Sequence, residues 1–157
     1  MTPVEVRTAH DDELELVAAL RWRWVGERDG LPEAQRAPFV RDFTAWARAH
    51  EATHHCFVVL VDEQVAGTAF LATTARVPTP HSLTRASGDL QCVYVAPEAR
   101  DRGLGGFLVE AALELAADLG LERVTVHSSE RAVGVYQRGG FATSTVLLHT
   151  RPADRQQ

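Results

Sequence analysis

The chain has 157 residues, of which 45% are hydrophobic and 24% charged, with a formal net charge of −5. This length fits one domain, and the composition excludes global disorder. The negative charge argues against nonspecific nucleic-acid binding, which needs a basic footprint, so we expect no nucleic-acid partner. Neither a signal peptide nor an apolar stretch approaching about 18 residues is present, so we expect a cytoplasmic protein with no membrane partner.

The N-terminal part is predicted to contain a strand and two helices. Residues 4–7 alternate between apolar and polar, which predicts a short strand. Asp11 or Asp12 is the expected N-cap of the next helix, which residues 26–32 should break. A second helix carries aromatic residues at spacings of three and four, typical of one buried face.

A hairpin and a long loop are predicted next. The continuous apolar run 56–61 predicts a buried strand, and residues 65–74 supply its hairpin partner. Residues 76–87 contain two prolines and several Ser and Thr residues, which predicts a long loop. Loops of about 12 residues are uncommon in compact domains and are often functional.

The C-terminal part reads as strand, helix, strand, helix and final strands. Residues 90–95 predict a strand, and residues 104–119 a helix with one apolar face that Gly120 ends. Residues 124–126 predict a strand parallel to the first, by the right-handed crossover rule. A short helix over 130–138 and last strands within 141–149 complete an α+β domain. We expect residues 1–157 to form this single domain, with 151–157 as a flexible tail.

No metal site is expected. Cys56 and Cys92 lack metal-ligand spacing and each sits in an apolar run, which favours buried free thiols. The histidines, including His81 and His127, have no regular metal spacing either.

A glycine-rich turn is the strongest candidate for a binding site. Between the strand at 90–95 and the following helix, the sequence reads Arg100-Asp101-Arg102-Gly103-Leu104-Gly105-Gly106. Glycines let the backbone approach a ligand, and the free amides and dipole of a helix start favour an anion such as phosphate. A plain helix start is the alternative. A P-loop is excluded because no Lys follows Gly106, and a dinucleotide fingerprint because position 108 is Leu.

Three motifs, in order, make the turn more specific: Val93-Tyr94-Val95-x-Pro97-Glu98, Arg100-x-x-Gly103-x-Gly105 and Ala132-x-x-x-Tyr136-x-x-x-Gly140-Phe141. Together they resemble the GCN5-related N-acetyltransferase (GNAT) superfamily, over about a third of the chain. The resemblance implies a three-layer α/β arrangement, with a mixed, mostly antiparallel sheet of six or seven strands. It also implies a splayed parallel strand pair, about four flanking helices, and acetyl-CoA as the co-substrate.

The resemblance also implies which residues bind acetyl-CoA. The backbones of Val93 and Val95 would contact the pantetheine amides as an added strand does. Amides of the turn would hold the pyrophosphate, from Arg100, Asp101 and Arg102 through Gly103, Leu104, Gly105 and Gly106. Ser129 is a departure from the family pattern, because many members have Asn at this position, where the family binds pantetheine; Ser129 would also cap the short helix.

Two residues are the catalytic candidates that the resemblance implies. Tyr136 matches the position of the family's general acid, which protonates the leaving thiolate; the alternative is a core tyrosine that only orders the CoA sulfur. Asp89 stands where the histone-acetylating branch has its catalytic glutamate; the alternative is an ordinary turn residue at a strand start.

We therefore expect an N-acetyltransferase in which a primary amine of a small molecule or peptide attacks acetyl-CoA directly. The alternatives are a catalytically inactive module that senses CoA or acyl-CoA, and a nucleotide-binding Rossmann unit. Family members are often dimers, so a homodimer is among the implied partners. The family places acceptor specificity in the first two helices, roughly residues 22–43, and in the loop at 76–87.

Overall fold

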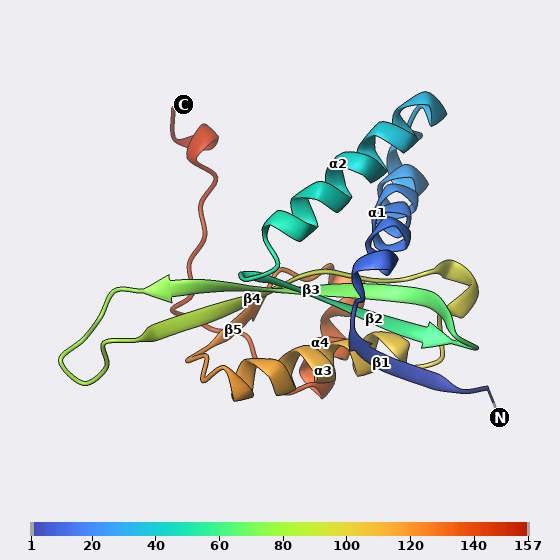
Figure 1. Cartoon of the computed structure of the whole chain (residues 1–157). Helices are drawn as coiled ribbons and strands as arrows, with labels where there is room; N and C mark the ends of the chain where they lie inside the picture. Colours follow the sequence, from blue (N-terminus) through green and yellow to red (C-terminus); the bar gives the residue numbers. More distant parts are fainter. Residues whose placement is uncertain (1, 157) are drawn as a thin grey trace.

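The structure is a computed structural model that describes residues 2–156 (Figure 1). Its strands and helices follow one another in the order β1 (Val4–Thr8), α1 (Leu14–Asp29), α2 (Arg36–Ala49), β2 (His54–Val61), β3 (Gln64–Arg76), β4 (Arg85–Val95), α3 (Leu104–Asp118), β5 (Val124–Val126) and α4 (Val133–Arg138). No helix within the described residues is long and apolar enough to cross a membrane.

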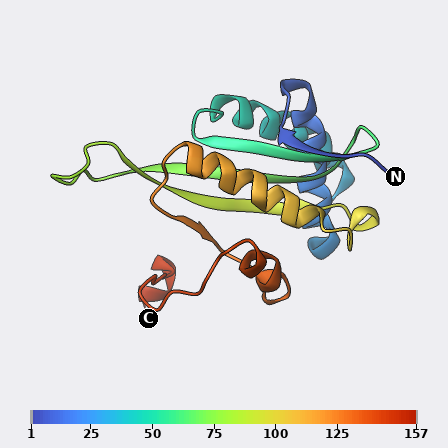
Figure 2. The ribbon, with the colours of Figure 1, turned by 90° about the horizontal axis from the view of Figure 1, so that it is seen from below.

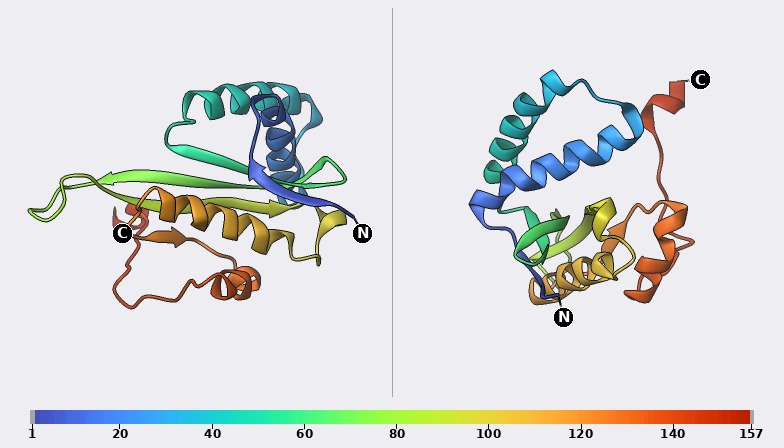
Figure 3. Two further views of the ribbon diagram at one scale, coloured as in Figure 1. Left: turned by 60° about the horizontal axis from the view of Figure 1, so that its bottom comes forward. Right: turned by 90° about the vertical axis from the view of Figure 1, so that its right-hand side faces the viewer.

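One mixed sheet organises the domain. Its strands lie in the order β1-β2-β3-β4-β5; the first three neighbouring pairs are antiparallel, and β4 and β5 are parallel. Helices α1 and α2 cover one face of the sheet, while α3 and α4 cover the other (Figures 1 and 3). The predicted α+β fold with a parallel β-α-β unit is therefore confirmed.

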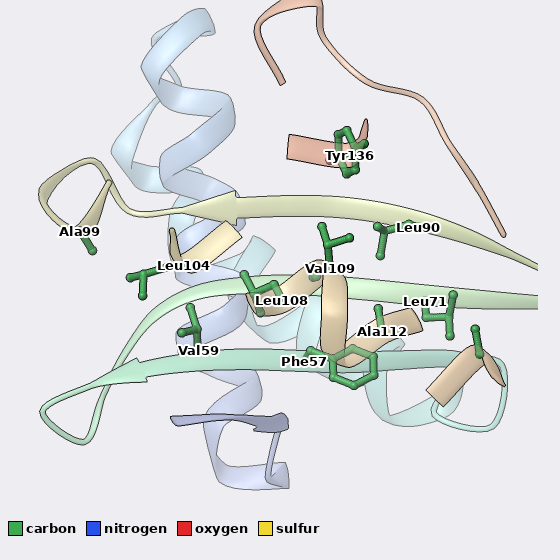
Figure 4. Close-up of a cluster of buried hydrophobic side chains, with 12 residues drawn as sticks. Phe57, Val59, Leu71, Leu90, Ala99, Leu104, Leu108, Val109, Ala112 and Tyr136 are labelled. Carbon is green, nitrogen blue, oxygen red and sulfur yellow. The ribbon is translucent and has the colours of Figure 1, made fainter. Parts of the chain in front are cut away.

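The core between the sheet and α3 holds the parallel pair in place. Leu104, Leu108 and Ala112 are fully buried on one face of α3, as the helical spacing predicted. They pack against side chains of β2, β3 and β4 such as Val59, Leu71 and Leu90 (Figure 4). A separate cluster between the sheet and α1 includes Val17 and Phe70.

A β-bulge in β4 separates it from β5. Phe70 pairs with Gln91 and Thr68 with Tyr94, so Cys92 and Val93 together oppose a single residue of β3. Cys92 takes a left-handed conformation with φ of +53°, which bends the bulged strand. The parallel pairing of β4 with β5 ends at Leu90 opposite Val126, so β4 beyond the bulge leaves one edge unpaired. The predicted splayed pair is present.

The sheet of the described residues has five strands, not the six or seven that were expected. Residues 141–149, predicted to supply the last strands, contain no strand. Their β-branched and apolar composition favours a strand locally, but a strand also needs a hydrogen-bonded neighbour, and this segment has none among residues 2–156.

Three predicted boundaries were wrong. Helix α1 continues through Gly26 and ends at Gly30, whose φ of +61° gives the left-handed cap, since a glycine inside a helix costs only about 1 kcal/mol. A 3-10 turn, Asp11–Glu13, leads into α1, and its N-cap is His10, whose amide donates a 2.7 Å hydrogen bond to the Glu13 side chain; neither Asp11 nor Asp12 is the cap. The expected loop at 76–87 shrinks to residues 77–84, because β3 and β4 pair as far as Arg76 and Arg85.

The C-terminal residues lie outside the sheet. A 3-10 helix spans Pro152–Gln156, where a flexible tail was predicted, and residues 151–155 are exposed. Gln157 lies outside the described residues. The single-domain extent of the chain stays a prediction.

Candidate functional site

A cavity of about 470 Å³ lies where the glycine-rich turn follows β4. Its walls come from four places in the chain: α1, the unpaired edge of β4, the turn with the start of α3, and the start of the α4 region. Of the predicted cofactor-binding residues, it gathers Val93, Val95, Arg100, Asp101, Gly103, Leu104, Gly105 and Ser129. Segments distant in sequence therefore meet at the point predicted for the cofactor.

The turn has the backbone shape of an anion site. Asp101 and Gly103 have φ of +61° and +74°, so the chain curls before α3 begins at Leu104. The amides of the first helical turn have no intrahelical acceptor and carry the positive end of the dipole. A Cβ added at Gly105 would meet no protein atom within 4 Å. The fold thus has no packing reason for glycine there, which fits close approach of a ligand to the backbone.

The Arg100 side chain turns back over the cavity. Its Nε donates to the carbonyl oxygen of Val95 at 3.0 Å, and Nη2 donates to Glu27 Oε2 at 3.3 Å. Its guanidinium lies 5.5 Å from the centre of the Tyr94 ring. The Val95 carbonyl, which the resemblance assigns to pantetheine, is therefore bonded to Arg100 in this structure.

Residues of α1 complete this wall. Glu27 Oε1 accepts a 2.6 Å hydrogen bond from the Tyr94 hydroxyl, and Trp24 stacks on the Tyr94 ring with centroids 5.3 Å apart. The hydroxyl of Tyr94 and, next, Arg100 lower the pKa of Glu27, so this carboxylate is ionised at neutral pH. Burial, with a smaller contribution from Glu27, raises the pKa of Tyr94 to about 12.

The remaining predicted cofactor-binding residues are Ser129, Arg102 and Gly106. Ser129 precedes the 3-10 turn Glu130–Ala132, but its side chain does not cap it, so that expectation was wrong. Ser129 does line the cavity. Arg102 and Gly106 are exposed and do not line the cavity, although Gly106 lies in the first turn of α3.

Tyr136 lies on α4 within the core cluster of the α3 face (Figure 4). The residue is 8% exposed, and its ring meets Phe141 edge to face at 5.7 Å. Burial raises the pKa of its phenol. Tyr136 does not line the cavity at the turn; it lines a second cavity beside β5.

Asp89 lies near the start of the parallel pair. Its carboxylate accepts hydrogen bonds from Thr125 Oγ1 at 2.9 Å and Gln91 Nε2 at 2.8 Å. Because Leu90 belongs to the α3-facing cluster and side chains alternate along a strand, Asp89 faces the α1 and α2 side. The two catalytic candidates therefore lie on opposite faces of the sheet.

Comparisons with known proteins identify this arrangement. The model of the acetyltransferase (GNAT) family matches residues 16–141. The chain belongs to the GNAT acetyltransferase family. A Bacillus subtilis relative, the uncharacterized N-acetyltransferase YhfO, is 27% identical over 67% of this chain and 71% of its own length.

Solved structures share the whole fold. A predicted acetyltransferase of Clostridium acetobutylicum, crystallised with acetyl-CoA, superposes with a TM-score of 0.76 at 17% identity over 97% of this chain and 98% of its own. Aminoglycoside N-acetyltransferase AAC(6')-Iy, solved with CoA, gives 0.71 at 19% identity over 96% and 95%.

For this GNAT acetyltransferase, the family implies acetyl-CoA as co-substrate, and the free amides and the open space at Gly105 fit its pyrophosphate. The sequence analysis did not predict Glu27 as a site residue, because the helix was expected to break at Gly26, which would have put Glu27 in a loop. Trp24, which is half-buried, lines the cavity as well. No group of three or more His, Cys, Asp or Glu residues that could hold a metal occurs between residues 2 and 156.

Proposed function

We propose that the protein transfers the acetyl group of acetyl-CoA to a primary amine of a small molecule or peptide, by direct attack of the amine on the thioester. The observation that carries the proposal is the cavity itself, which joins the unpaired edge of β4 to the free amides of the turn. Acetyl-CoA has an extended pantetheine arm, which matches the strand edge, and a diphosphate, which matches the amides. The backbone of Val93 would bind the arm, and amides from Arg102 to Gly106 the diphosphate.

Tyr136 is proposed as the general acid. A thiolate has a reference pKa of about 8.5, so a proton donor speeds its departure. Because burial raises the pKa of Tyr136, its phenol stays protonated at neutral pH and can donate. Its position on the α3 face means that the thiol end must reach past Ser129 toward α4.

Asp89 is proposed as the base or as the anchor of a bridging water. An alkyl ammonium has a pKa of about 10 and must lose a proton before it attacks. Thr125 and Gln91 fix the orientation of the Asp89 carboxylate and leave lone pairs on both oxygens for a further donor. The amine would thus be deprotonated on the α1 and α2 face while the thiolate is protonated from the other.

A thiol-release assay tests the proposal. The protein is incubated with acetyl-CoA and a panel of primary amines, including a lysine-containing peptide, and free CoA thiol is measured with a chromogenic disulfide. Burial raises the pKa of the Cys56 thiol to about 12 and that of Cys92 above its usual range, so the protein's own thiols give a low background. Amine-dependent thiol release is the expected result.

Melting curves separate acetyl transfer from the alternative of a sensor. A sensor without turnover would show a higher melting temperature with acetyl-CoA or CoA but no thiol release with any amine. That outcome would overturn acetyl transfer. The Rossmann alternative is excluded by the sheet, in which three of the four neighbouring strand pairs are antiparallel.

A further inference from the structure

The side of α1 that faces the sheet carries one arginine, Arg21. It lies four residues after Val17 and three before Trp24, so all three residues share one side of the helix. Val17 packs against the sheet, and Trp24 stacks on Tyr94 of β4. Burial raises the pKa of the Cys92 thiol, and the nearby charge of Arg21 opposes that rise. The guanidinium of Arg21 therefore faces the β4 bulge.

Arg21 is one end of a stack of four side chains with a guanidinium at each end. Its guanidinium carbon lies 4.8 Å from the centre of the Trp24 ring, and Trp24 stacks on Tyr94, which has Arg100 at 5.5 Å from its ring centre. Arg100 is paired with Glu27 at 3.3 Å. Arg21 makes no ion pair with any residue from 2 to 156. The stack is thus charge-compensated at the cofactor end and uncompensated at the other.

This lack of a counter-charge sets Arg21 apart from the other partly buried arginines. Three of the described arginines are half-buried, namely Arg7, Arg21 and Arg85. Arg7 donates two hydrogen bonds of 2.8 Å to Glu13, and Arg85 donates bonds of 2.6 and 2.9 Å to Glu122. The Arg21 side chain donates no hydrogen bond within the described chain, and its nitrogens are not sealed from solvent. It is therefore an open fork of the kind that binds a carboxylate through two N–H groups.

The sheet in front of Arg21 is open and carries the opposite charge. Asp89, the proposed base, lies on the same face of β4, three residues before Cys92 and so roughly 10 Å away along the strand. Gln91 is exposed and Asp89 is half-buried, so the helices leave this stretch of β4 uncovered. Figure 2, seen from the α3 side, shows α1 crossing behind the sheet while α2 lies toward β2. One accessible face thus offers a cation and an anion to a ligand.

We propose that the acceptor is an amino acid, whose carboxylate binds Arg21 while its amine is held at Asp89. The inference rests on the proposed function, since it assigns the acceptor of the same transfer. A zwitterion matches both charges, and complementary charges fix the orientation of a ligand in its site. A plain alkyl amine leaves Arg21 uncompensated, and a polyamine brings a second cation toward it, which is unfavourable. The fork thereby selects amino acids against amines that have no acid group.

The transfer yields CoA and an N-acetyl amino acid. The new C–N bond replaces the C–S bond of the thioester, the ammonium proton leaves toward Asp89, and the thiolate takes a proton from Tyr136. The product is a neutral amide that keeps its carboxylate, so it loses its attraction to Asp89 and keeps the contact with Arg21. Binding of the product is therefore a test of Arg21 that needs no turnover.

Matched acceptors test the inference in the thiol-release assay. The panel holds amino acids with small, aliphatic, aromatic and acidic side chains, the amide of each, and phosphoethanolamine. For the best amino acid, kcat/KM should exceed that of its amide at least about tenfold, the effect of one charged hydrogen bond, although the amide has the less basic amine. Arg21→Gln should abolish this preference and Arg21→Lys should retain part of it. A phosphate-bearing amine preferred over every amino acid would overturn the choice of a carboxylate.

The control is Arg23→Gln. It removes the same charge from the same helix, but from an exposed arginine bonded to Glu98, so the preference for acid over amide should remain. Equal loss in Arg23→Gln and Arg21→Gln would reduce the effect to net charge and overturn the assignment. Melting curves establish that each variant is folded; if Arg21→Gln is not, Arg21→Lys and the wild-type preference decide.

Calorimetric titration separates failure of this inference from failure of acetyl transfer. The wild type with CoA should bind the N-acetyl form of the preferred amino acid at least about tenfold more tightly than Arg21→Gln does. Thiol release with acids and amides alike would overturn the amino-acid acceptor while acetyl transfer stands. Without thiol release from any amine, acetyl transfer fails, and the titration is run with each N-acetyl amino acid of the panel. Binding of none of them, or binding that Arg21→Gln leaves unchanged, overturns the role of Arg21.

Discussion

Two cavities flank the parallel pair of β4 and β5, and they are built in opposite ways. The cavity at the glycine-rich turn is walled by polar groups that already bond to one another, such as Glu27 with Tyr94 and Arg100 with Val95. The cavity beside β5 is largely apolar, and its outer wall, from residues within 142–147, makes no backbone hydrogen bond to the sheet among residues 2–156. The first cavity is therefore shaped by polar contacts, and the second by the packing of apolar side chains. Substitutions in the first should change ligand binding, and substitution of Tyr136, which lines the second, should change turnover.

The largest effect is expected at Gly105. Gly105→Val places a side chain where no protein atom lies but where the diphosphate would approach, so affinity for CoA should fall by more than about 100-fold, the cost of about two lost charged hydrogen bonds. Stability should not fall, because valine is a better helix former than glycine. Calorimetric titration and melting curves measure the two effects. The control Gly26→Ala also adds a side chain in open helical space and should leave CoA binding unchanged.

Tyr136→Phe should lower kcat by about 100-fold, at the lower end for loss of a general acid, with acetyl-CoA affinity changed less than about twofold. The control is Tyr94→Phe, which removes the only other phenol and its bond to Glu27 but should retain most of kcat. Because burial raises the pKa of Tyr136, its phenol stays protonated to a higher pH than a free tyrosine, so alkaline loss of kcat from this group should begin at a higher pH than the titration of a free phenol. Full turnover by Tyr136→Phe would show that Tyr136 is not the general acid.

The smallest effect is expected at Glu27. Glu27→Gln should change CoA affinity by no more than about threefold, because the ion pair with Arg100 is more than a third exposed and such pairs contribute little. The folded pKa of Glu27 is depressed, so its charge is present above its unfolded pKa of about 4.3 and lost as pH falls through the lower folded value. The difference between wild type and variant should thus be constant from pH 5 to 8 in titrations. Glu98→Gln, which breaks the ion pair with Arg23 outside the cavity, is the control and should leave affinity unchanged.

Features that depend on nearby residues in the chain were predicted correctly from the sequence. The apolar face of α3 and the Gly120 stop predicted the helix within one residue, and the β-α-β order predicted the parallel pair. The glycine turn was predicted because it depends on residue type at fixed spacing. The strands predicted at 141–149 are absent because a strand needs a hydrogen-bonded neighbouring strand, and the composition of one segment does not specify whether it has such a neighbour.

Other features depend on tertiary context. The bulge at Cys92 could not be predicted, since cysteine has no preference for positive φ. The contact of Glu27 with the site depended on where α1 ends, and two glycines, Gly26 and Gly30, were both candidates for that end. The roles of Tyr136 and Asp89 came from the resemblance, and the structure adds that they approach the parallel pair from opposite faces.

The left-handed conformation of Cys92 has a consequence for the speed of binding. The bulge is held by pairing with β3 on the far side of β4, so the gap between β4 and β5 exists before any ligand arrives. The backbone strain at this one residue costs on the order of 1–3 kcal/mol, and this cost is incurred when the chain folds rather than at each binding event. Association with CoA should then follow a single exponential whose rate rises linearly with ligand concentration, without a slow step in which the sheet opens.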